Sequence, residues 1–122
     1  MTLRYLDFDY CEDEQGWGTF DAVASTLAAQ VPTVQAEIVQ VLRWAHTAFP
    51  NAQAPLDDGG EWDFNLQGQQ EWTAHEALHY HPGARHITAL LSPPGPTRHT
   101  VALSISGSAS FCEALRQQFG LD

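Results

Sequence analysis

Lysine is absent from this sequence, and positive charge of any kind is scarce. The 122 residues include 15 acidic side chains against five arginines, which gives a formal net charge of −10. Nucleic-acid binding needs a basic surface that neutralises phosphates, and attachment to an anionic membrane needs one as well. Reactions that use a lysine Schiff base or the lysine of a phosphate-binding loop have no residue to use here. We therefore expect neither a nucleic-acid partner nor a membrane partner.

Long hydrophobic runs and closely spaced cysteines are also missing. No apolar run approaches the roughly 18 residues of a membrane-spanning helix, and the N-terminal segment turns acidic early, so we expect no signal peptide. Cys11 and Cys112 lack C-x-x-C spacing; they can pair, but one disulfide does not make a disulfide scaffold, and a reducing compartment is favoured. These features predict a cytoplasmic location, and arginine without lysine beside abundant alanine is typical of a GC-rich bacterial genome.

What is present is a clear hydrophobic periodicity. The two-residue repeat of strands is found in five segments: residues 5–10, 17–24, 61–66, 71–80 and 101–106. Residues 87–91 are rich in apolar side chains and follow the turn signal Pro82-Gly83, so we expect them to form a sixth strand that pairs with the one before it. Helical spacing follows residues 31–49, whose apolar stripe contains Val34, Ile38, Val41, Leu42, Ala45 and Phe49. A short helix closes the chain, where Ser110 and Glu113 fit a capping box and Gly120 fits a C-terminal cap.

This order, β-β-α-β-β-β-β-α with short connections, predicts an α+β fold in a single domain spanning residues 1–122. We expect one antiparallel sheet of about six strands that carries both helices on one face. Its other face then stays uncovered. Trp17, Thr19 and the histidine-rich face around His79 would lie there, exposed to solvent or to a partner.

One motif points to metal chemistry. His75-Glu76-Ala77-Leu78-His79 matches H-E-x-x-H, the signature of zinc hydrolases, in which two histidines on one helical face bind zinc and the glutamate activates the bound water. The following residues up to His86 look like the longer metzincin pattern with one extra residue before the glycine. The resemblance implies Glu76 as the base and His75, His79 and His86 as zinc ligands.

The local pattern around this motif favours a strand instead of a helix. Trp72, Ala74, Leu78 and Tyr80 alternate with mostly polar residues, and on a strand residues four apart lie about 13 Å from each other, too far to share a metal. A milder metal hypothesis survives on a strand. If Pro82-Gly83 forms a tight turn, His79 lies across from His86 with His81 on the same face, and the alternative is that these histidines are simply exposed.

Two further side chains have a possible role outside the core. Cys112 lies in the first turn of the predicted last helix, where the helix dipole lowers a thiol pKa; the competing interpretation is a small buried core residue. Trp44 lies at the edge of the helical apolar stripe and is the best candidate for an exposed aromatic side chain that marks a partner surface.

The sequence as a whole favours a small acidic protein without a catalytic site, a cofactor or a metal. We predict a protein-binding or self-associating domain that meets another protein, or a second copy of itself, through the uncovered face of the sheet. The alternative is a zinc-dependent hydrolase that uses His75, Glu76 and His79.

Overall fold

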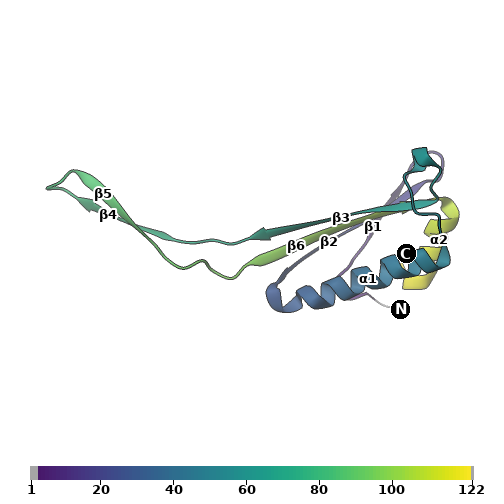
Figure 1. Ribbon diagram of the computed structural model, residues 1–122, viewed down its shortest axis with the longest axis horizontal. Coiled ribbons are helices and arrows are strands. Elements are labelled where there is room, and N and C mark those ends of the chain that lie inside the picture. The colour runs from purple at the N-terminus through teal and green to yellow at the C-terminus, as the bar shows by residue number, and fades with distance from the viewer. Residues whose placement is uncertain (1–2, 122) are drawn as a thin grey trace.

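The computed structural model describes residues 3–121, which form a sheet covered by two helices and a long hairpin that projects away from them (Figure 1). The elements, in chain order, are β1 (Asp9–Glu12), β2 (Gly18–Leu27), η1 (Ala28–Gln30), α1 (Val31–Ala48), η2 (Leu56–Asp58), β3 (Trp62–Glu71), β4 (Glu76–His81), β5 (His86–Leu91), β6 (Arg98–Gly107) and α2 (Ala109–Phe119). The predicted α+β class and the predicted order of strands and helices are both confirmed.

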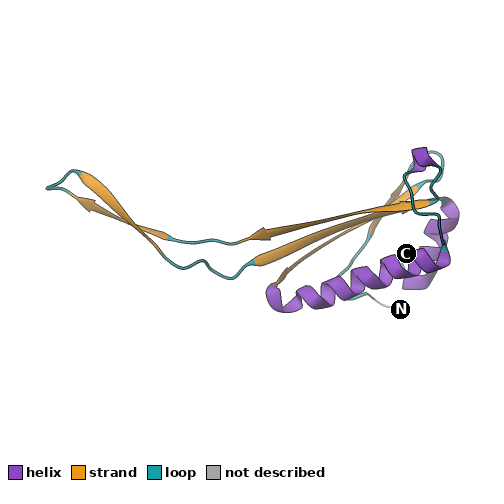
Figure 2. Ribbon diagram, in the orientation of Figure 1, coloured by secondary structure: helices purple, strands orange, loops and turns teal. Residues whose placement is uncertain are grey.

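The strands form two separate sheets, so the expectation of a single six-stranded sheet was wrong. The larger sheet has the order β1-β2-β6-β3, and β4 and β5 pair only with each other. All pairings between these strands are antiparallel. Alternation reports which side chains share a face and says nothing about which strands are neighbours. Here β4 and β5 lie beyond the far end of the β3–β6 pair instead of beside it (Figure 2).

The prolines between β5 and β6 explain why the pairing of β3 with β6 does not continue without a break into the pairing of β4 with β5. The segment between β5 and β6 contains Pro93, Pro94 and Pro96, and a proline has no backbone N–H to donate to a neighbouring strand. The four-stranded sheet therefore ends at the pair Glu71 and Arg98.

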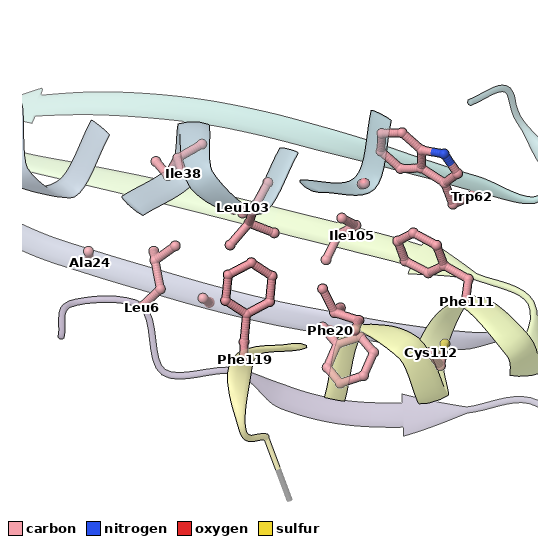
Figure 3. Packing of buried hydrophobic residues seen from close by; sticks show 14 of the residues in the cluster. Leu6, Phe20, Ala24, Ile38, Trp62, Leu103, Ile105, Phe111, Cys112 and Phe119 are labelled. Atoms are coloured by element: carbon pink, nitrogen blue, oxygen red, sulfur yellow. The ribbon is translucent and has the colours of Figure 1, made fainter. Parts of the chain in front are cut away.

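The core lies between one face of the four-stranded sheet and the two helices (Figure 3). The apolar stripe of α1 faces inward as predicted, with Val34, Ile38, Val41 and Ala45 buried. The indole ring of Trp62 is fully buried and stacks on Phe111 of α2, with ring centroids 5.5 Å apart. All buried residues of the core come from residues 6–62 and 103–119, so the projecting hairpin contributes none of them.

The first strand is shorter than predicted, because a buried carboxylate holds the chain before it. Only Asp9–Glu12 pairs with β2. The backbone N–H groups of Arg4, Tyr5 and Leu6 donate instead to the side-chain oxygens of Glu37 on α1, at 2.9–3.1 Å. Leu6 is thereby held in the core by the helix and not by the sheet.

The last helix starts two residues earlier than the capping-box pattern indicated. Its N-cap is Ser108, whose hydroxyl accepts a hydrogen bond from the N–H of Phe111, so the assignment to Ser110 was wrong. Gly120 ends the helix with a left-handed backbone conformation, φ 64°, as expected. Within residues 3–121, neither helix is long and apolar enough to cross a membrane.

Candidate functional site: the projecting arm

The feature that sets this molecule apart is the projecting hairpin, which we call the arm and define as residues 72–97. It contains β4, β5, the turn between them and the two segments that join them to β3 and β6. Those two segments are tied to each other: the N–H of Ser92 donates to the carbonyl oxygen of His75 and the N–H of Gly95 to that of Thr73, both at 2.8 Å. The arm therefore extends the β3–β6 ribbon well past the helices (Figure 1).

One face of the arm is apolar and uncovered. The register pairs Leu78 with Ala89 and Tyr80 with Ile87, and side chains two apart on a strand point the same way. Leu78, Tyr80, Ile87 and Leu91 consequently share one face, which we call the apolar face. Between 59% and 64% of each of these four side chains is exposed, an unusual degree for large apolar residues gathered in one place.

The opposite face of the arm carries a histidine cluster. His79 and His81 lie with ring centroids 4.5 Å apart, and the ring of His86 stacks on that of His81 at 4.8 Å. His81 also contacts the hydroxyl of Thr88 through its Nε2, at 2.9 Å. The three histidines that the sequence placed on one face are therefore together in the structure.

The predicted register of this cluster was wrong. His86 pairs with His81 and His79 pairs with Thr88, because the turn takes four residues, 82–85, where a two-residue turn had been assumed. In the described part of the chain, no group of three or more histidine, cysteine, aspartate or glutamate side chains is arranged to hold a metal ion.

The H-E-x-x-H segment is not helical. Glu76–His81 is strand β4, and His75 directly precedes it. An extended chain separates residues four apart by roughly 13 Å, so His75 and His79 do not converge as the zinc-hydrolase resemblance requires. Glu76 lies at the base of the apolar face, paired with Leu91, and His86 lies in the partner strand β5.

Charge is distributed very unevenly between the arm and the rest of the protein. Residues 72–97 contain one carboxylate, Glu76, and one guanidinium, Arg85, so with neutral histidines the net charge of −10 belongs entirely to the remaining residues. Glu76 lies at the start of the hairpin and Arg85 in the turn at its tip. The two charges of the arm therefore bracket the apolar face.

A shallow pocket of about 410 Å³ lies at the base of the hairpin. Its lining comes from both strands and from the segment after β5, and comprises His75, Glu76, Ala77, Leu90, Leu91, Ser92 and Pro93. The lining is mostly apolar, with one carboxylate at its margin.

Cys112 is a core residue and not an activated nucleophile. Its side chain is buried, its Sγ donates to the carbonyl oxygen of Gly107 at 3.4 Å, and burial raises the pKa of its thiol. Burial also raises the pKa of the neighbouring Tyr10 to about 12, helped by the hydrogen bond from its hydroxyl to Glu12. Both cysteines are free thiols.

The prediction that Trp44 is an exposed aromatic side chain was wrong. Trp44 is half-buried and packs against Phe49, Phe111 and Phe119. The exposed indole is that of Trp72, at the root of the arm. A signal was available: the proline-rich segment 92–96 separates the fourth and fifth strands from the last one, and the chain has no third helix to cover them.

No protein-family model matches the chain, and the comparisons with characterised proteins and with solved structures found no similar protein.

Proposed function

We propose that this protein is a non-catalytic association domain whose arm is its contact surface for another protein chain or for a second copy of itself. The observation that carries the proposal is the apolar face, on which Leu78, Tyr80, Ile87 and Leu91 lie exposed together. An isolated two-stranded hairpin is marginally stable in water. A second layer packed on the apolar face removes that surface from water and stabilises the hairpin at the same time.

The contact surface proposed here differs from the one predicted from the sequence, which was the uncovered face of the sheet. That face is largely polar: it carries Asp21 and Ser25 from β2, Asn65 and Gln67 from β3, and Ser104 and Ser106 from β6. The large apolar side chains of β2 that are exposed on this face are Val23 and, at the end of the strand, Leu27. The arm offers several such side chains in one patch, which is what distinguishes an interface from ordinary surface.

The free thiols of Cys11 and Cys112 support a cytoplasmic location.

Sedimentation velocity of the purified protein over a wide concentration range tests the proposal. We expect the wild-type protein to sediment faster as its concentration rises, and Leu78→Ser/Ile87→Ser to remain monomeric at concentrations where the wild type associates. Val39→Ser is the matched control, because Val39 is 58% exposed but lies on α1, away from the arm. A double variant that associates as well as the wild type would contradict the proposal.

A second measurement covers association with a different protein. A photo-reactive amino acid replaces Tyr80 and, as a control, Val39, and crosslinking is carried out in cells. We expect crosslinks at position 80, to a second copy or to one defined protein, and none at position 39. Equal crosslinking at both positions would show that the arm is not a specific contact surface.

A further inference from the structure

We infer that the occupant of the apolar face is the arm of a second copy of this chain, packed face to face and antiparallel about a two-fold axis. This inference rests on the proposed function and specifies both the partner and its orientation. In such an interface the same surface is used by both copies, so each contact between two different residues occurs twice.

The size of the apolar face fits a dimer of this kind. Four large side chains, each about three-fifths exposed, present on the order of 500 Å² of apolar surface, at the upper end of what monomers expose. Covering this face on both copies removes about 1,000 Å² from water, the lower limit for a specific interface. The uncovered Trp72 at the root of the arm adds to the surface that a second copy can reach.

The two charges of the arm decide the orientation. Glu76 lies at the base of the hairpin and Arg85 at its tip. An antiparallel arrangement brings the tip of each arm to the base of the other, and so places each Arg85 beside the partner copy's Glu76. A parallel arrangement places like charges next to each other, which is unfavourable.

The charge on the rest of the protein favours the same orientation. Everything outside the arm carries the net charge of −10, so two such bodies repel each other. Antiparallel arms place the bodies at opposite ends of the dimer. The segment between β3 and β4, residues 72–75, adds about 13 Å of extended chain between each body and the overlapping hairpins. That distance exceeds the screening length of about 8 Å at physiological ionic strength.

Charge reversal tests this arrangement, with the dimer dissociation constant measured by sedimentation equilibrium. We expect Glu76→Arg and Arg85→Glu each to raise it about tenfold or more, because each reversal creates two like-charge contacts. The double variant E76R/R85E restores both contacts in swapped form, and an equimolar mixture of the two single variants restores them in a heterodimer. Both should therefore bind about as tightly as the wild type.

Two exposed residues outside the arm control for the change in net charge. Glu113→Arg and Arg43→Glu alter the net charge as the two arm variants do, but lie on α2 and α1. We expect the dissociation constant of each to stay within about twofold of the wild type, since exposed charges distant from an interface are largely screened.

The possible results separate this inference from the proposed function. If the single variants bind like the wild type and their mixture binds more tightly, the arms pair in parallel and the antiparallel arrangement is wrong. A wild-type monomer that is crosslinked to a different protein through position 80 overturns the second copy as partner while the arm remains a contact surface. A Leu78→Ser/Ile87→Ser variant that dimerises normally overturns both.

Discussion

At the scale of single residues, the most consequential side chain is one that the hydrophobic pattern does not single out. Glu37 lies on the buried side of α1, 8% exposed, and its two oxygens accept four hydrogen bonds from three successive backbone N–H groups. These bonds replace strand pairing for residues 4–6. The carboxylate thus links the N-terminal segment to the helix and keeps Leu6 in the core.

We expect Glu37→Gln to lower the free energy of unfolding by about 2 kcal/mol, because hydrogen bonds to a charged group are worth more than neutral ones and an amide nitrogen cannot accept from an N–H. Urea denaturation measures the change. Glu113→Gln is the control, since Glu113 is exposed on α2 and its carboxylate accepts a hydrogen bond from the side chain of Gln117, one turn away. Equal stability of the two variants would contradict the anchoring role of Glu37.

At the scale of elements, α2 shows how a local pattern can be right in kind and wrong in position. Both Ser108 and Ser110 suit an N-cap by residue type. Ser108 is the cap, because the chain leaves β6 at Gly107, where the backbone packs so closely on the ring of Phe111 and the carbonyl of Glu61 that a Cβ atom would clash with both. The end of the strand therefore determines where the helix begins.

We expect Ser108→Ala to destabilise the protein by about 1 kcal/mol, the usual loss when an N-cap hydroxyl is removed. Its hydroxyl also donates to Glu61 at 3.0 Å. Ser110→Ala serves as the matched control. Ser110 is exposed within the first turn, and its replacement should change the stability by less than about 0.5 kcal/mol. Thermal or urea unfolding distinguishes the two serines, and a larger effect at Ser110 would restore the capping-box interpretation.

For the arm, the local pattern of the two strands was predicted correctly, but the position of these strands in the fold was not. Its alternation and the shared face of His79 and His81 follow from a two-residue repeat, which is a local property, whereas the position of His86 opposite His81 depends on the length of the turn. Its separation from the main sheet depends on which edges remain free after β6 pairs with both β2 and β3. That outcome involves residues far apart in the chain, and alternation carries no information about it.

At the scale of the whole molecule, the hydrophobic core and the proposed contact surface lie in different parts. The core lies between the four-stranded sheet and the helices, and no buried residue belongs to the arm. The arm carries the exposed apolar residues in their highest density but no net charge, whereas the remaining residues carry the negative charge. We interpret this division as a folded, self-repelling body that presents a neutral contact element at a distance.

Removal of the arm tests this division directly. Glu71 and Arg98 face each other at the end of the β3–β6 pair, so an Asn-Gly turn can join them in place of residues 72–97. We expect the shortened protein to keep its circular dichroism signature for helix and sheet, to unfold cooperatively and to remain monomeric at every concentration. Loss of cooperative unfolding would show that the arm is part of the fold, and retained association would show that another surface is responsible.

The sequence by itself determined the properties that depend on neighbours in the chain. These are the α+β class, the order of elements, the inward stripe of α1, the C-terminal cap at Gly120 and the face shared by the arm's histidines. Only the tertiary structure decided what depends on distant pairs. It placed β6 between β2 and β3, made Ser108 the cap, buried Glu37 against residues 4–6, and left β4 and β5 without a covering layer. The absence of lysine is a property of the sequence alone, and on grounds of charge it predicts that nucleic acids and anionic membranes are not partners. The contact surface that we propose on the arm depends instead on shape and exposure, which no local pattern encodes.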